Sequence, residues 1–135
     1  MKRRDFIAGA ILAVSLPFAA ISGETVEYKP GLVDEALAEG KTVFVDFGTD
    51  WCTTCAAQKR AVEALRDENP AYDDAITFVY VNWDQYSKDA LSKRLKIPRR
   101  SVLVALRGNT EIGRVTLGTS KKEIKALLDA ALASS

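Results

Sequence analysis

Residues 45–55 read Val-Asp-Phe-Gly-Thr-Asp-Trp-Cys-Thr-Thr-Cys, and the fold can be predicted outward from this segment. The apolar run 43–47 has almost no polar break, which is the pattern of a β-strand covered on both faces. A short Gly-Thr-Asp turn follows, and from Cys52 onward the apolar spacing predicts a helix to about Asp67. The stretch therefore predicts a buried strand, a turn and a helix that begins with two cysteines three positions apart.

The rest of the chain, read outward from this stretch, alternates between strand and helix patterns. Further strands are expected at 25–28, 76–81, 102–106 and 111–117, and further helices at 32–37, 91–95 and 120–131. The resulting order is βαβαβαββα. Such alternation is typical of the α/β class, with an open sheet and helices on both of its faces.

The two cysteines occupy the position that a redox pair needs. At the start of a helix Cys52 would lie among unpaired backbone N–H groups, whose partial positive charge favours the thiolate. Cys55 follows almost one turn later, close enough to form a disulfide with it. We therefore predict that Cys52 is the nucleophile that attacks a partner's disulfide, and that Cys55 resolves the mixed disulfide.

Other interpretations of the pair have to be weighed against the composition. A purely structural disulfide is one alternative, although closing so small a loop would stabilise the fold little. The chain has two cysteines, no histidine and one methionine, the initiator, so it cannot supply the about four ligands of a zinc site. Cu(I) held by the two thiolates alone stays open as an alternative function, of the metallochaperone type. The main prediction includes no metal site.

Length, charge and the absence of histidine limit the classes of protein to which the chain can belong. The chain of 135 residues is 47% hydrophobic and 27% charged, which fits one soluble domain. A net charge of +1 and the lack of a basic stripe give no reason to expect nucleic-acid binding. Without histidine, no imidazole base can take part in catalysis. We expect a monomer.

Residues 1–22 have the pattern of an export signal. After a positively charged start, the apolar stretch 7–21 is shorter than the ~20 residues of a membrane span. Arg3-Arg4-Asp5-Phe6-Ile7 resembles the twin-arginine export signal of bacteria, with an ordinary secretory signal and a retained membrane anchor as alternatives. We expect cleavage after Ser22, one domain over 23–135 and a periplasmic location.

The segment 45–55 as a whole resembles the active-site segment of the thioredoxin superfamily, in which a strand ending in Asp-Phe leads to Trp-Cys-x-x-Cys. The order of the predicted strands and helices over residues 25–133 resembles that of the same superfamily. It implies a thioredoxin-like fold, with a central mixed β-sheet flanked by helices on both faces. It also implies a thiol–disulfide oxidoreductase that acts on protein thiols and disulfides through its redox-active disulfide, without an organic cofactor.

Asp46 is a carboxylate within the apolar strand, on the same face as Phe44 if side chains alternate. Burial disfavours the ionised form and should raise its pKa. In thioredoxins an acid here exchanges a proton with the resolving cysteine, so the resemblance implies this role for Asp46 toward Cys55. An edge-facing aspartate bonded to a turn is the alternative. Tyr80 stands where thioredoxins usually carry a lysine, so Asp46 should be harder still to ionise.

Thioredoxins place a cis-proline against the sulfurs, just before the strand expected here at 102–106. Pro98 is one candidate for this position, but counting back from the strand favours Ser101, which makes a cis peptide bond doubtful. Arg99 and Arg100 would then lie near Cys52. They would lower the pKa of its thiol or attract an acidic partner; a solvated basic loop is the alternative.

The resemblance also implies which residues meet the substrate and in which direction electrons flow. We expect substrate contacts from Trp51, Thr53, Thr54, Arg100 and Ser101, although Trp51 could instead fill the core. Thr-Thr between the cysteines matches neither the Gly-Pro of reducing thioredoxins nor the Pro-His of the strong periplasmic oxidant. Because the chain lacks that histidine and an inserted helical domain, we expect a reductant or isomerase, kept reduced by a membrane thiol relay.

Overall fold

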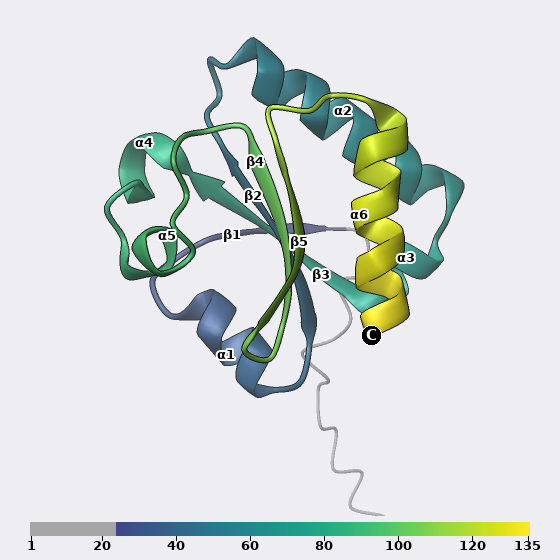
Figure 1. Cartoon of the computed structure of the whole chain (residues 1–135), viewed down its shortest axis with the longest axis horizontal. Coiled ribbons are helices and arrows are strands. Elements are labelled where there is room, and N and C mark those ends of the chain that lie inside the picture. Colours follow the sequence, from purple (N-terminus) through teal and green to yellow (C-terminus); the bar gives the residue numbers. More distant parts are fainter. Residues whose placement is uncertain (1–23) are drawn as a thin grey trace, which may run out of the picture.

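The computed structural model describes residues 24–135, and the predicted export signal with its cleavage point lies outside these residues. Its sheet comprises β1 (Thr25–Glu27), β2 (Thr42–Gly48), β3 (Ile76–Asn82), β4 (Val102–Arg107) and β5 (Thr110–Thr116), in the spatial order β1-β3-β2-β4-β5 (Figure 1). The helices are α1 (Leu32–Ala38), α2 (Thr53–Glu68), α3 (Ala71–Ala75), α4 (Trp83–Tyr86), α5 (Ala90–Arg94) and α6 (Lys121–Ser134).

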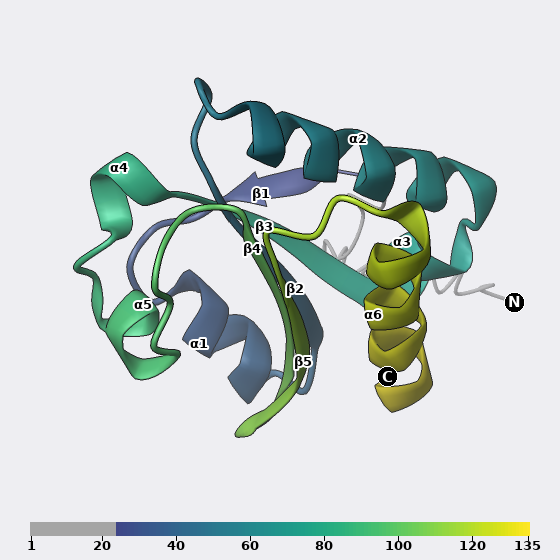
Figure 2. The ribbon, with the colours of Figure 1, turned by 45° about the horizontal axis from the view of Figure 1, so that its top comes forward.

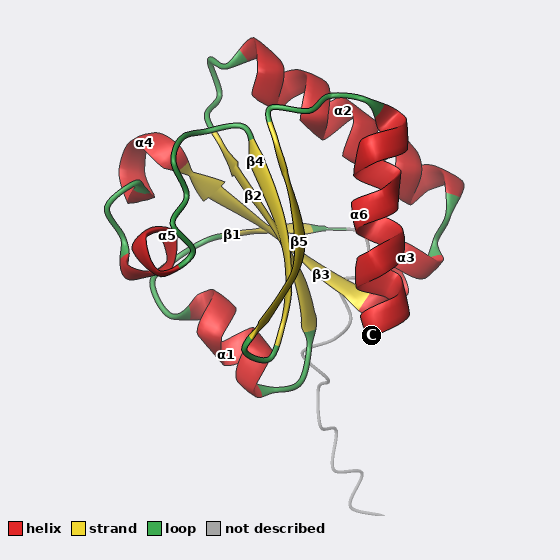
Figure 3. Cartoon of the chain, in the orientation of Figure 1, coloured by secondary structure: helices red, strands yellow, loops and turns green. Residues whose placement is uncertain are grey.

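The sheet is mixed. Strands β1, β3 and β2 run parallel to one another, β4 runs antiparallel to β2, and β5 pairs antiparallel with β4. Figure 3 shows α2, α3 and α6 on one side of the sheet and α1, α4 and α5 on the other. The predicted fold class, a mixed sheet with helices on both faces and a hairpin at its end, is therefore confirmed.

Two apolar cores lie on the two faces of β2, which is the middle strand of the sheet. Val43, Val45 and Phe47 belong to the core shared with α1 and α5, whereas Phe44 belongs to the core shared with α2, α3 and α6. Strict alternation along the strand thus sends Asp46 to the α2 side, as predicted. Because β2 pairs with β3 and β4 on its two sides, Asp46 is not on an edge strand.

The structure differs from the expected elements in three main places. The short helix α3 between α2 and β3 was not expected. A single helix at 91–95 is replaced by α4 and α5, because Asn82 accepts a hydrogen bond from the Asp84 N–H and Asp89 accepts one from the Leu91 N–H, so that each begins a helix. The strand at 111–117 ends one residue early. No helix within residues 24–135 has both the length and the apolar character to cross a membrane.

Candidate active site

The cysteine pair lies at the junction between β2 and α2, at the upper end of the sheet in Figure 2. Cys52 has an extended backbone and caps α2, and its Sγ accepts the Cys55 N–H at 3.2 Å. Both cysteines are free thiols that keep about a twentieth of their surface exposed, 6% for Cys52 and 5% for Cys55. The helix start therefore directs a backbone donor at the first sulfur.

Ser101 lies between the two sulfurs. Its Oγ is 3.3 Å from Cys52 Sγ and 3.0 Å from Cys55 Sγ, and the side chain is fully buried. The structure thus puts Ser101 rather than Pro98 against the pair, and the peptide bonds of residues 24–135 are all trans. Full burial leaves the serine no exposed surface for a substrate, so its predicted substrate contact would require the loop to move.

The surroundings of the two thiols drive their pKa values apart. Although burial opposes ionisation, hydrogen bonds from the Cys55 thiol, the Ser101 hydroxyl, the Cys55 amide and Arg100 lower the pKa of Cys52. Burial and the hydrogen bond to Cys52 raise the pKa of Cys55. At neutral pH the first sulfur is therefore the thiolate and the second is the thiol.

Trp51 and Arg100 form the outer wall of the site. The tryptophan is 60% exposed, so it does not fill the core. Its Nε1 donates to Asp84 Oδ2 at 2.7 Å, and the Arg100 guanidinium lies 4.2 Å from the ring centroid, in cation–π contact. Arg100 Nε is buried and finds no hydrogen-bond partner in the described part of the chain.

The threonines and the first arginine differ in their exposure. Thr53 is exposed and Thr54 is half-buried, both in the first turn of α2. Arg99 is exposed, and its Nε donates to the Arg100 carbonyl at 3.2 Å. The alternative of a solvated basic loop thus describes Arg99 but not Arg100, whose guanidinium stacks on the indole ring and lowers the pKa of Cys52.

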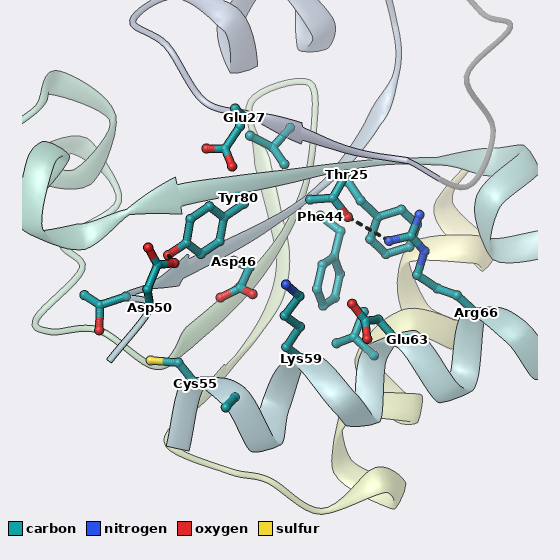
Figure 4. A pocket seen from close by; sticks show the side chains of 15 residues that line it. Thr25, Glu27, Phe44, Asp46, Asp50, Cys55, Lys59, Glu63, Arg66 and Tyr80 are labelled. Carbon is teal, nitrogen blue, oxygen red and sulfur yellow. Dashed lines mark hydrogen bonds between the residues drawn. The ribbon is translucent and has the colours of Figure 1, made fainter. Parts of the chain in front are cut away.

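A cavity of about 420 Å³ lies beneath the pair, between α2 and the sheet (Figure 4). Asp46, Cys55, Lys59 and Tyr80 are among its lining residues. A methyl group placed on Gly48 would lie 3.3 Å from Asp46 Oδ1 and 3.4 Å from both Cys55 Cβ and Tyr80 Cε2. The carboxyl group, the resolving cysteine and the phenol ring therefore converge on a position where even a methyl group would fit only tightly.

Asp46 titrates near neutral pH. Burial raises the pKa of this carboxyl group to about 7; the Lys59 ammonium works against the shift and the charge of Cys52 adds to it. Asp46 Oδ1 is shielded from solvent and has no hydrogen-bond partner within residues 24–135. The group can thus take up or release a proton at physiological pH, next to Cys55.

Lys59 is a site residue that the sequence analysis missed. The absence of a lysine at Tyr80 led us to expect no ammonium near Asp46, but Figure 4 shows the Lys59 amine directed toward the Asp46 carboxylate from α2. The expectation was wrong because only one position was considered. The available signal was the spacing: Lys59 follows Cys55 by four residues, so the two share one face of the helix.

Gln58 was missed as well. It is fully buried, and its Nε2 donates to the Ser101 carbonyl and the Gly118 carbonyl, both at 3.0 Å. The side chain therefore connects α2 to the loop before β4 and to the loop after β5. Nothing in the sequence distinguishes it from other polar residues of a helix.

A metal site of several ligands is not formed. Over the described residues, no three His, Cys, Asp or Glu side chains lie close enough together to hold a metal ion. The oxygen atom that is hydrogen-bonded to both sulfurs is the Ser101 hydroxyl. Cu(I) held by the two thiolates therefore stays a sequence-based alternative.

Comparison with known proteins places the chain in a family. Residues 28–108 match the family model described as thioredoxin-like. The thiol:disulfide interchange protein TxlA of Synechococcus elongatus is 30% identical over 74 residues, which are 55% of this chain but only 37% of that protein. The thioredoxin-like protein CXXS1 of Oryza sativa is 26% identical over 102 residues, 76% of this chain and 71% of that protein.

Solved structures extend the likeness across the fold. The crystal structure of Trxlp from Edwardsiella tarda has a TM-score of 0.65 and 30% identity, over 76% of this chain and 98% of that one. Spinach chloroplast thioredoxin f, long form, has a TM-score of 0.66 and 26% identity, over 84% of this chain and 90% of that one. Both likenesses cover most of the part of the chain that the structure describes.

Proposed function

The chain belongs to the thioredoxin-like family of thiol–disulfide oxidoreductases, whose proteins act through a cysteine pair without a cofactor, and we propose that it reduces disulfides of exported proteins. The observation that carries this proposal is the asymmetry of the pair. Cys52, whose pKa is lowered, lies beside an exposed tryptophan, whereas Cys55, whose pKa is raised, lines the cavity between α2 and the sheet. This arrangement suits an attacking thiolate and a resolving thiol.

The reaction proceeds in two exchanges. The Cys52 thiolate attacks one sulfur of the partner's disulfide, a mixed disulfide forms, and the partner's other sulfur leaves as a thiolate that solvent protonates. Cys55 then gives its proton to Asp46 and attacks Cys52 Sγ, which releases the second partner thiolate. The partner gains two electrons, and the chain ends with a Cys52–Cys55 disulfide.

The partner binds at the outer wall. Trp51 offers an exposed flat ring, and Thr53 is exposed at the start of α2. Among residues 24–135 the Arg100 carbonyl accepts a hydrogen bond only from the exposed side chain of its neighbour Arg99. An extended partner segment can therefore pair with the backbone at Arg100 while its cysteine reaches Cys52. Protein thiols and disulfides are the substrate class that this surface suits.

The same proposal includes the direction of electron transfer, the location of the protein and the source of its electrons. The Thr-Thr dipeptide carries no histidine to stabilise the thiolate, which favours reduction, whereas the hydrogen bonds from Ser101 and Arg100 stabilise the reduced form and moderate that preference. The twin-arginine-like segment supports export to the periplasm. Outside the cytoplasm a membrane thiol relay would have to supply electrons.

Insulin reduction by the full chain with dithiothreitol as electron source tests the proposal. Cys52→Ser should abolish turnover, Cys55→Ser should accumulate a mixed disulfide with the substrate, and Ser87→Ala, on an outlying turn, should change neither. A wild-type chain that does not turn over disulfides would contradict the function. Titration against dithiothreitol tests the direction: a reduction potential near ~−120 mV, that of a strong oxidant, would reverse it.

A further inference from the structure

The serine between the two sulfurs has no role in the second exchange, the resolving step, as described above. Its hydroxyl is within hydrogen-bond distance of both Cys52 Sγ, at 3.3 Å, and Cys55 Sγ, at 3.0 Å. A hydroxyl has one proton to donate and two lone pairs, so it can donate to one sulfur and accept from the other. We propose that Ser101 is a catalytic residue whose hydroxyl stabilises whichever of the two cysteines carries the negative charge.

The backbone of Ser101 holds the hydroxyl in place. Its N–H donates to the Phe47 carbonyl at 2.8 Å, and its carbonyl accepts from the Leu117 N–H at 2.8 Å and from Gln58 Nε2 at 3.0 Å. These three bonds keep the residue at a φ of 66°, a left-handed conformation that is unfavourable for a side chain with a Cβ. With the residue fully buried, its hydroxyl has no route to solvent.

In the reduced protein the Ser101 hydroxyl donates to the Cys52 thiolate, to which the S–H of Cys55 also donates. When Cys52 attacks a partner's disulfide, its negative charge passes to the departing sulfur, and Cys52 no longer needs the donor. Cys55 then loses its proton to Asp46, and the hydroxyl turns to donate to the new Cys55 thiolate as this attacks Cys52 Sγ. Ser101 keeps its own proton throughout. Only this second stage rests on the proposed function.

Other groups around the pair act differently. The charged or titratable side chains that face it are Arg100 of the loop before β4, Asp46 of β2, Tyr80 of β3, Asp50 of the turn before α2 and Lys59 of α2. The Ser101 hydrogen bond lowers the pKa of both thiols. Only a group that contacts both sulfurs can serve both halves of the exchange.

Two variants remove the hydroxyl while treating the backbone differently. Ser101→Ala keeps a Cβ atom at the unfavourable φ. Ser101→Gly removes the backbone strain, because glycine adopts positive φ at no steric cost. The rate of Cys52 alkylation by iodoacetamide is measured against pH in the reduced full chain. In both variants we expect the midpoint to rise by about one pH unit, the loss of one hydrogen bond to a charged sulfur, with the glycine variant at least as stable as the wild type.

Ser92→Ala is the matched control, because this buried serine donates to the Tyr86 carbonyl at 2.8 Å, away from the pair. It should leave the midpoint unchanged. An unchanged midpoint in the folded Ser101→Gly variant would overturn the proposal. So would a shift in Ser101→Ala alone, because that result would assign the effect to the backbone.

The resolving step is measured separately. Reduced protein is mixed with one equivalent of a symmetric chromogenic aromatic disulfide: attack by Cys52 releases the first aromatic thiol and forms the mixed disulfide, and attack by Cys55 on Cys52 Sγ releases the second. We expect both Ser101 variants to release it about tenfold more slowly at neutral pH, and an equal rate would overturn this half of the proposal. Neither assay uses a protein substrate, so a wild type inactive on insulin would refute the proposed function and leave the inference on Ser101 standing.

Discussion

At the scale of the residue, the site depends on three polar groups that only the folded chain brings to the sulfurs. Arg100 and Ser101 stabilise the Cys52 thiolate. Asp46, whose pKa is about 7, lies beneath Cys55. Arg100 is stacked on Trp51, so the exposed indole both presents a surface and holds the cation in position. The reactivity of Cys52 therefore depends on a side chain from a different loop.

The charge of Lys59 should set the pH at which Cys55 can react. Its ammonium lowers the pKa of Asp46, so Lys59→Met should raise that pKa further and leave less carboxylate at neutral pH. The pH profile of the resolving step should move upward by about half a pH unit, because the charge acts through partly solvated space. Single-turnover release of a thiol from Cys52, followed against pH, measures the shift.

Two further variants sharpen this measurement. Arg60→Met removes a cation from the next, exposed position of α2 and should leave the profile in place. Lys59→Arg keeps the charge and should restore most of the wild-type profile. If Arg60→Met moved the profile as far as Lys59→Met, net charge rather than the position of Lys59 would be responsible.

At the scale of the element, the junction between β2 and α2 is where fold and chemistry meet. Gly48 ends the strand at the point where Asp46, Cys55 and Tyr80 converge. A methyl group there would have to displace the Asp46 carboxyl group by a few tenths of an ångström. The close approach of helix and strand is thus a condition for proton exchange between Asp46 and Cys55.

Gly48→Ala tests this closeness. The added methyl group would lie 3.3 Å from Asp46 Oδ1, so we expect a loss of about 1–3 kcal/mol in the free energy of unfolding. The resolving step should slow more than Cys52 alkylation, since only Cys55 depends on Asp46. Gly40→Ala is a control for glycine replacement in open space: it costs stability through its positive φ but should leave the ratio of the two rates unchanged.

At the scale of the whole molecule, the buried acid links stability to pH. The folded pKa of Asp46, about 7, lies above its ordinary value of 3.8, so the folded state binds the proton more tightly than the unfolded chain. This contribution is fully present below the ordinary pKa and is lost as pH rises through about 7. The part of the stability that Asp46 governs should therefore fall between about pH 4 and pH 7.

Asp46→Asn should abolish this dependence. At alkaline pH we expect the variant to be more stable than the wild type by up to about 4 kcal/mol, and at acidic pH the difference should shrink toward zero. Urea unfolding of the reduced proteins at both pH values measures it. The same variant should slow disulfide exchange at neutral pH, because Cys55 loses its base.

Asp67→Asn, on the exposed face of α2, is the matched control and should change the free energy of unfolding equally at both pH values. Equal effects of pH on the wild type and on Asp46→Asn would show that the carboxyl group is already ionised when buried. That outcome would also remove the reason to assign Asp46 as the base.

The sequence alone determined the fold class and the reactive pair. These follow from patterns that act over a few residues: the apolar run of β2, the breaks at turns and the cysteines at the first turn of α2. The face of Asp46 followed from alternation, and the expectation of Ser101 near the sulfurs followed from counting back along β4. Local spacing is sufficient for such predictions because strand and helix periods are constant.

The contacts that set the pKa values of the two cysteines depend on how distant segments pack together. The Ser101 hydroxyl meets Cys52 and Cys55 across 49 and 46 residues of chain, and Trp51 meets Asp84 across 33. The direction of Lys59 toward Asp46 depends on how α2 packs on the sheet. Such contacts are set by the packing of whole elements, and no period along the chain encodes them. The cysteines, Asp46 and Ser101 could therefore be predicted from the sequence, whereas Lys59 and Gln58 could not.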